Sequence, residues 1–123
     1  MAGKFEIKKT NTGWNFDLKS GNGEVILTSQ VYTTEASCKA GIASIQSNAP
    51  VAAVEDQTVE GYEEEKNPKF EIYFDNAAEF RFRIQARNGE IIGVSAGYTS
   101  KANCKNGIES VIKNAPDATV VEI

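Results

Sequence analysis

The chain of 123 residues contains no histidine, only two cysteines and a single methionine. Without histidine it lacks the side chain that most often acts as a general base near neutral pH. We expect Cys38 and Cys104, which occupy the same place in two similar segments, to be reduced and buried as small hydrophobic residues. The sequence also lacks zinc-ligand spacing, a calcium loop, a glycine-rich phosphate loop and a dinucleotide fingerprint. We therefore expect neither a metal nor a cofactor and assign no catalytic residue.

Long apolar runs are absent as well. No stretch approaches the ~20 apolar residues of a membrane-spanning helix, and the N-terminus leads into a strand pattern without a signal-peptide core. We expect a soluble, cytoplasmic protein that does not associate with a membrane. The net charge is −4, but six of the 17 acidic residues lie within residues 55–65. The overall acidity therefore reflects one segment and says little about the rest of the surface.

What the sequence does contain is an internal duplication. Residues 22–50 and 88–116 align without a gap and are identical at 16 of 29 positions. One repeat alone is too short to bury a comfortable core, so we expect the two to share one core. The predicted organisation is a single domain over residues 1–123, made of repeat 1 (3–55), a flexible acidic linker with a turn at Gly61 (56–68) and repeat 2 (69–122).

Each repeat has the pattern βββαβ. Alternating apolar residues predict strands over 4–9 and 14–19, and an Asn-Gly turn introduces a third strand over 24–31. A helix follows, capped by Thr33 or Thr34 and ending near Asn48, and then a short strand over 51–54. The second repeat predicts the same order, with strands near 69–74, 79–86, 90–96 and 118–122 and a helix near 100–114.

Glycine recurs on the apolar face of both predicted helices, at Gly41 and Gly107. Glycine inside a helix costs about 1 kcal/mol relative to alanine. Its presence at both equivalent positions indicates that each helix lies close to the sheet there, with no room for a Cβ atom. The predicted fold class is α+β, with two helices on one face of one antiparallel sheet and the other face partly solvated.

Four short segments occur twice, namely Asn-Gly-Glu-x-Ile, Tyr-Thr, Gly-Ile-x-Ser and Asn-Ala-Pro. In these segments the chain resembles the YegP-like family of small bacterial proteins, over roughly residues 3–55 and 68–122. The resemblance implies two β3-α-β motifs that form a single sheet and exchange their C-terminal strands. It implies no biochemical activity and no site residues.

The three arginines of the chain, Arg81, Arg83 and Arg87, form the most suggestive cluster. Arg81 and Arg83 lie two apart on a predicted strand, so they emerge on one face. The first repeat has Asn15 and Asp17 in their place, so the basic row belongs to one half only. Rows of guanidinium groups suit carboxylate or phosphate partners, and we treat these arginines as candidate partner-binding residues. Alternatively, the row is a solvated face on which acidic residues of neighbouring strands pair with the arginines.

The leading hypothesis is a non-enzymatic binding module, monomeric, that contacts an anionic protein or small molecule through the exposed sheet face. Three arginines make a small footprint and the aromatic residues of this strand face the other way, which disfavours nucleic acid. Two alternatives stay open: an enzyme with a cleft between the repeats, and a weak nucleic-acid-binding accessory protein. Tyr32 and Tyr98, at the strand-to-helix junction of each repeat, form a further candidate ligand site.

Overall fold

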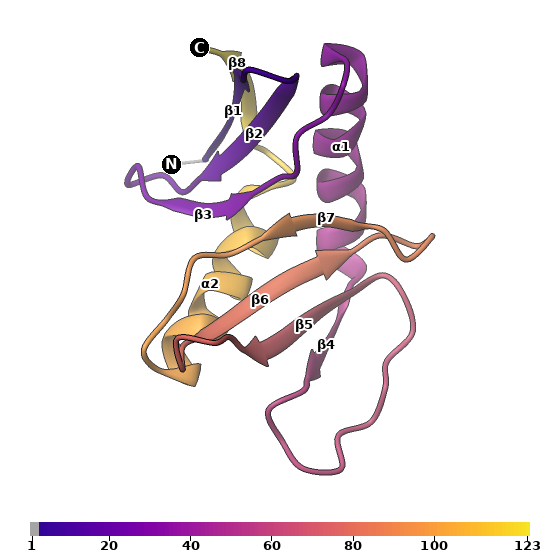
Figure 1. The fold of residues 1–123 in the computed structure, drawn as a ribbon, viewed down its shortest axis with the longest axis vertical. Helices are drawn as coiled ribbons and strands as arrows, with labels where there is room; N and C mark the ends of the chain where they lie inside the picture. The colour runs from indigo at the N-terminus through magenta and orange to yellow at the C-terminus, as the bar shows by residue number, and fades with distance from the viewer. Residues whose placement is uncertain (1–2) are drawn as a thin grey trace.

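The computed structural model describes residues 3–123. Figure 1 shows one sheet with both helices on the same side of it. The first repeat contains β1 (Lys4–Lys9), β2 (Trp14–Lys19), β3 (Val25–Thr28), α1 (Glu35–Asn48), a 3₁₀ turn (Ala49–Val51) and β4 (Ala53–Asp56). The second contains β5 (Lys69–Phe74), β6 (Phe80–Gln85), β7 (Ile91–Val94), α2 (Lys101–Asn114) and β8 (Thr119–Glu122).

All eight strands form one sheet in the order β4-β5-β6-β7-β3-β2-β1-β8. β4 pairs with the first strand of the second repeat, and β8 pairs with the first strand of the first repeat. The implied exchange of C-terminal strands is thereby confirmed, as is the α+β class. Neighbouring strands among the inner six are antiparallel to one another, but each exchanged strand is parallel to the inner strand beside it. The sheet is therefore mixed rather than purely antiparallel. Neither parallel pair is joined by a hairpin: residues 57–68 connect β4 to β5, and β1 and β8 are the first and last strands of the chain.

The two repeats meet at a pseudo-two-fold axis between β3 and β7. Thr28 lies opposite Val94, and these are equivalent positions of the aligned repeats. Beside them the symmetry is broken, because Leu27 is equivalent to Gly93. A Cβ atom on Gly93 would lie 2.6 Å from Cγ of Leu27. One leucine thus fills the space that two equivalent leucines could not share.

The third strand of each repeat is shorter than predicted. β3 ends at Thr28 because the next residue replaces a backbone acceptor with its side chain: the Phe16 N–H donates to Ser29 Oγ at 2.9 Å. Ser95 does the same for the Phe82 N–H at the end of β7. The fourth strand of repeat 1 begins at Ala53 rather than two residues earlier, because a 3₁₀ turn that includes proline intervenes.

The first helix has one of its predicted caps, Thr34, and the second has the equivalent residue, Ser100. Thr34 Oγ1 accepts the Ser37 N–H at 3.0 Å, and Ser100 Oγ accepts the Asn103 N–H at 3.1 Å. Each helix packs on its own repeat and then on the other: α1 contacts β2 and β7, and α2 contacts β6 and β3. A single hydrophobic core therefore spans both repeats, as predicted. Across residues 3–123, neither helix has the length and hydropathy needed to cross a membrane.

Candidate functional site

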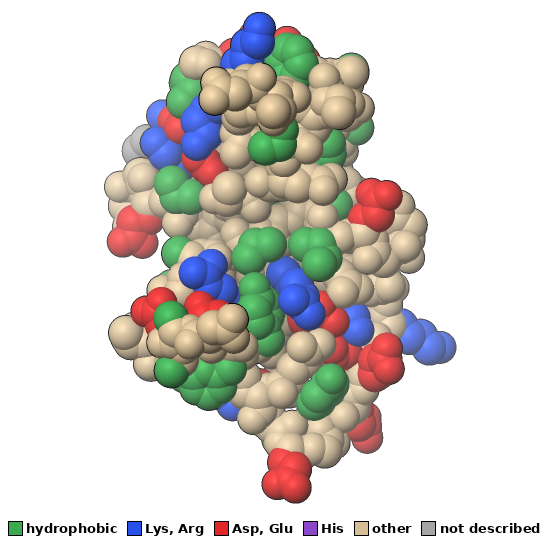
Figure 2. All heavy atoms as spheres, in the orientation of Figure 1, with side chains coloured by type: hydrophobic (Ala, Val, Ile, Leu, Met, Phe, Trp, Pro, Cys, Tyr) green, Lys and Arg blue, Asp and Glu red, His purple; other side chains and the backbone are tan. Residues whose placement is uncertain are grey.

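The sheet face opposite the helices, here called the open face, carries two of the three candidate arginines, Arg81 and Arg83. β5 and β6 place Arg81 opposite Tyr73, Arg83 opposite Glu71 and Gln85 opposite Lys69. Figure 2 views this face and shows hydrophobic side chains at its middle with basic side chains to either side. The alternation of β6 explains the arrangement, since Phe82 and Ile84 are fully buried on the helix side.

Arg81 is held at the rim of the sheet by two contacts. Its Nε donates to Asp75 Oδ2 at 2.6 Å, and its Nη1 donates to the Ser95 carbonyl at 3.0 Å. The guanidinium, followed by the Glu79 N–H, lowers the pKa of Asp75. About a third of the Arg81 side chain stays exposed. Within residues 3–123, no group accepts a hydrogen bond from its Nη2, so this edge of the guanidinium still has donors to offer.

Arg83 is more deeply committed to the fold. Its Nε donates to Glu71 Oε1 at 2.6 Å, and its guanidinium lies 4.5 Å from the centre of the Tyr73 ring. Glu71 is 4% exposed and also accepts from Gln85 at 2.8 Å. The cross-strand pairing of Glu71 with an arginine that we weighed as the alternative therefore does occur. Because the buried Glu71 carboxylate would lose an ionic partner if Arg83 moved away, we assign Arg83 a structural role.

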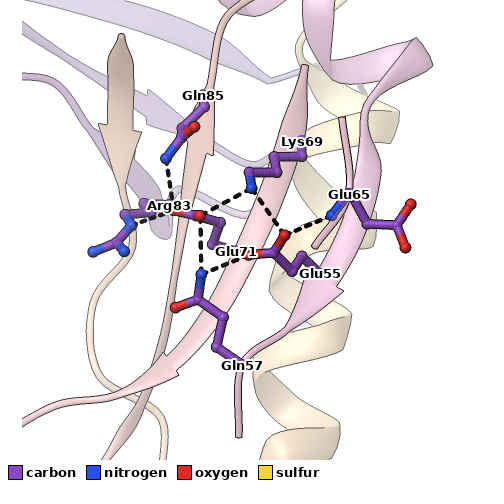
Figure 3. Close-up of polar contacts among 7 residues, drawn as sticks. All are labelled: Glu55, Gln57, Glu65, Lys69, Glu71, Arg83 and Gln85. Carbon is purple, nitrogen blue, oxygen red and sulfur yellow. Dashed lines mark hydrogen bonds and ion pairs between the residues drawn. The ribbon is translucent and has the colours of Figure 1, made fainter. Parts of the chain in front are cut away.

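The pair of Arg83 and Glu71 continues into a buried ionic network (Figure 3). Lys69 Nζ lies 2.8 Å from Glu55 Oε1 and 3.4 Å from Glu71 Oε2. Glu55 is 2% exposed; burial raises its pKa, but hydrogen bonds from Lys69, Gln57 and the Glu65 N–H outweigh this effect and lower the pKa to about 2. The Glu65 N–H donates to Glu55 at 2.7 Å, which fixes the acidic linker to the open face of β4. The linker also turns at Gly61, which has φ +75°.

Arg87 does not join the other two arginines. It follows β6 in the turn before β7 and lines a hollow with Ser44 and Asn48 at the C-terminal end of α1. β6 ends at Gln85, so Arg87 lies beyond the alternation that places the other two arginines on one face. The structure therefore places two of the three predicted arginines together and directs the third toward a helix.

Beside Arg81, a shallow groove of about 470 Å³ follows the line where the repeats meet. Val25 from β3 and Ile91 from β7 are equivalent residues, and they stand on its walls 43% and 42% exposed. Thr28 and Val94 lie between them at the pseudo-two-fold axis. Sequence reasoning missed this groove. The sequence held one signal for the groove. Apolar residues follow one another in the third strands, whereas a strand with one solvated face alternates apolar and polar residues.

The two tyrosines form two separate junctions and no common site. Each ring stacks on a core phenylalanine with centroids 6.4 Å apart, Tyr32 on Phe16 and Tyr98 on Phe82. Their hydroxyl groups point at the helical glycines, and a Cβ on Gly107 would lie 2.6 Å from the hydroxyl oxygen of Tyr98. Burial raises the pKa of both tyrosines. The close approach predicted from the glycines is confirmed, with the tyrosine hydroxyls occupying the space.

Both cysteines are free and fully buried, as predicted. Burial, followed by the charge of Asp56, raises the pKa of Cys104 to about 11. Burial also raises the pKa of Cys38. The reactive form of a cysteine is the thiolate, so this environment disfavours nucleophilic chemistry at either position.

Comparison with known proteins identifies relatives over the whole chain. A family model described as a domain of unknown function, DUF1508, matches residues 10–56 and 75–122. The UPF0339 protein YegP of Yersinia pestis is 42% identical over 98% of this chain and 96% of its own length. A UPF0339 protein of Treponema denticola is 64% identical over 55 residues, which are 95% of that protein but 45% of this chain. The solution structure of yegP from E. coli, described as a protein of unknown function, has a TM-score of 0.80 and 36% identity, covering 99% of this chain and 93% of that one.

Proposed function

The chain belongs to the YegP-like family of DUF1508 proteins, and on that premise we propose that it is a non-enzymatic binding module whose contact surface is the open face of the sheet. The observation that supports this proposal is the groove between the repeats, which combines exposed apolar walls with a partly exposed guanidinium. Exposed apolar side chains rimmed by polar groups are typical of interaction sites. Here Val25 and Ile91 supply the apolar surface and Arg81 supplies the charge.

The chemistry of Arg81 favours a partner with a single anionic group. Its Nε and Nη1 are used by Asp75 and Ser95, and the remaining Nη2 edge can donate to a carboxylate or phosphate oxygen. Asp75 and Glu71 largely neutralise the two arginines of the row. A polyanion such as nucleic acid needs several uncompensated cations, so the local charge favours a protein or small-molecule partner.

The titration behaviour of the buried groups agrees with a binding role. A general acid or base works best with a pKa near the working pH. The two largest shifts move the pKa away from neutrality: that of Glu55 is lowered to about 2 and that of Cys104 is raised to about 11. Each group therefore keeps one protonation state near neutral pH.

Variants on and off the open face test this proposal. Arg81→Gln removes the charge at the rim, and Ile91→Asp places a carboxylate in the groove; both residues are partly exposed, so the fold should be retained. Arg87→Gln is the matched control, since it removes an arginine that lies beside α1. Partners captured from a lysate of the native host by the wild type should be lost with the first two variants and kept with the control. Identical partner sets for all four proteins would contradict the proposal.

The nucleic-acid alternative has its own measurement. Binding through phosphate contacts weakens steeply as salt is added. We expect no shifted band with single- or double-stranded DNA or RNA at low salt. A salt-sensitive complex that Arg81→Gln weakens would replace the protein or small-molecule partner with a nucleic acid.

A further inference from the structure

β8 leaves one edge of the sheet open. Among residues 3–123, it is the last strand in the sheet order and pairs with β1 alone. The Thr119 N–H donates to Gly3 and the Ile123 N–H to Ile7. Alternate residues of a parallel strand face the same neighbour, so the N–H and C=O groups of Val120 and Glu122 face away from β1. They form a short row of backbone groups able to pair with another strand.

A groove runs beside this edge on the helix side. It has a volume of about 440 Å³ and lies between β8 and α1. Ile42, Ala43 and Val120 provide its apolar lining, with Lys39 and Glu122 at its mouth. Val120 is 46% exposed. A strand added to β8 would direct every second side chain into this groove, which would bury the apolar surface that is now open.

The opposite edge of the sheet, at β4, is equivalent to the β8 edge by the duplication but carries different charges beside its helix. There, Lys101 at the start of α2 lies 3.0 Å from Asp56 at the end of β4 and links the helix to the edge strand. The equivalent residues at the β8 edge are Glu35 and Glu122, two acids that cannot pair with each other. They share Lys39, which lies 3.4 Å from Glu35 and 3.7 Å from Glu122. Lys39 therefore makes the link from α1 to β8 at this edge, and with two acids and one lysine the mouth of the groove carries one excess negative charge.

We propose that the β8 edge binds an extended segment of a partner protein by strand addition, and that this segment alternates apolar and basic residues. The outward backbone groups of β8 supply the hydrogen bonds, the groove over Ile42 and Ala43 takes the apolar side chains, and Glu35 and Glu122 attract the basic ones. Affinity from the main chain with specificity from alternate side chains is the usual pattern of such recognition. A second copy of the chain is a poorer occupant, because its own β8 would bring a further acidic residue, Glu122, to an acidic mouth. This surface lies at the far end of the sheet from β4 and is separate from the open-face groove.

The probe is a capped hexapeptide of alternating lysine and valine, added to the full-length protein and followed by NMR. We expect the amides of Val120 and Glu122 to shift and to exchange more slowly with solvent, while an alternating glutamate–valine peptide leaves them unchanged. Glu35→Lys recreates the bridge seen at the β4 edge and should weaken binding by at least about threefold, the effect of one rim charge. Lys101→Glu, at the equivalent position of the other edge, is the matched control and should leave binding at β8 unchanged.

A second variant tests the backbone contribution. Val120→Pro removes an outward N–H that β1 does not use, and proline is tolerated on an edge strand; Val54→Pro is the equivalent control on β4. Binding should be lost in the first variant and kept in the second, with unchanged thermal unfolding of each. Equal binding of the acidic peptide, binding that survives Val120→Pro, or no protection at millimolar peptide would overturn the proposal. So would protection of the same amides that rises with protein concentration in the absence of peptide, because the occupant would then be a second copy.

Discussion

Single glycines set the distance between helix and sheet. Gly107 of α2 lies where a Cβ would approach the Tyr98 hydroxyl to 2.6 Å and Cε2 of Phe82 to 2.9 Å. Neither ring can move freely, since Phe82 is fully buried and Tyr98 stacks on it. Glycine therefore occupies this position despite its poor helix propensity, because the Tyr98 hydroxyl and the Phe82 ring leave no room for a Cβ atom.

Gly107→Ala should lower the free energy of unfolding by about 1–2 kcal/mol. Overpacking costs about 1–3 kcal/mol, and the better helix propensity of alanine returns at most about 1 kcal/mol. Urea unfolding followed by circular dichroism measures the difference. Asn106→Ala, at the exposed neighbouring position of the same helix, is the control and should be neutral or stabilising. A Gly107→Ala protein as stable as the wild type would show that the tyrosine moves away at little cost.

Glu55 links stability to pH. Its pKa is about 2 in the folded protein, below the ordinary value of 4.5. A carboxyl group whose pKa is lowered on folding contributes stability above its unfolded pKa, and that contribution is lost as the pH falls through the folded value. The wild type should therefore lose stability progressively between about pH 4.5 and pH 2.

Glu55→Gln should reduce that dependence. At pH 7 we expect a loss of about 1–3 kcal/mol, because Lys69 keeps only Glu71 as an ionic partner. The difference between variant and wild type should shrink as the pH is lowered, since the wild-type carboxylate becomes protonated too. Urea titrations at pH 7, 4 and 2.5 give the comparison, with Glu64→Gln in the exposed linker as the control. A difference that stays constant with pH would mean that the charge of Glu55 contributes nothing.

The candidate site could be predicted only in part from its residues. Alternation along one strand placed Arg81 and Arg83 on the same face, and the structure agrees. The sequence held no sign that Asp75, in a turn, would fix Arg81, whereas the Asn-Gly turn directly after Arg87 does place that arginine beyond the strand. Long-range pairs such as Glu55 with Lys69 depend on strand exchange, which no local pattern encodes.

At the scale of the elements, β3 and β7 join the two repeats at the pseudo-two-fold axis, and one residue pair sets the packing there. Leu27 is fully buried and its side chain lies over Gly93. Because the positions are equivalent, exchanging the two residues places the leucine on the other side of the pseudo-two-fold axis in the same space. The contact should depend on having one leucine, whichever strand supplies it.

The single and double variants of this pair should be strongly non-additive. Leu27→Gly should cost about 3–6 kcal/mol from the lost side chain and the added chain freedom. Gly93→Leu should cost at least about 1–3 kcal/mol from overpacking. The double exchange should recover to within about 1 kcal/mol of the wild type, which a double-mutant cycle on urea unfolding would measure. Additive losses would show that the surroundings of the two positions differ too much for the symmetry to apply.

Element boundaries show where local patterns stop being informative. Alternation gave β1, β2 and β5 with the same bounds that the structure has. The third strands were predicted too long because Ser29 and Ser95 are residues that a strand tolerates. Each still donates its N–H to the neighbouring strand, but its hydroxyl group takes the place of the carbonyl acceptor that would continue the ladder. The local pattern predicted the fourth strands but not which strands they pair with, and the structure shows that each pairs in parallel with the first strand of the other repeat. Pairing of this kind is decided by the crossover and the shared core rather than by the residues of the strand.

The whole molecule depends on each repeat completing the other. β4 has its partner strand in repeat 2, β8 has its partner in repeat 1, and each helix contacts strands of both. A separated repeat would leave an unpaired parallel strand and half of a core open to water. The one-repeat relative from Treponema denticola matches 55 residues of this chain over nearly its whole length, so a single repeat does exist as a protein.

A fragment of residues 1–56 should therefore fold only as a homodimer that exchanges β4. In such a dimer β4 of each copy pairs with β1 of the other, as β4 pairs with β5 in the full chain. Folding coupled to association makes stability depend on concentration, so the thermal midpoint of the fragment should rise as the protein concentration rises. The full-length chain, in which the two repeats are covalently joined, should show a midpoint independent of concentration and sediment as a monomer. A fragment that sediments as a monomer and unfolds cooperatively at one midpoint would mean that a repeat holds its own core, because the exchanged strand would then have to pair within its own repeat.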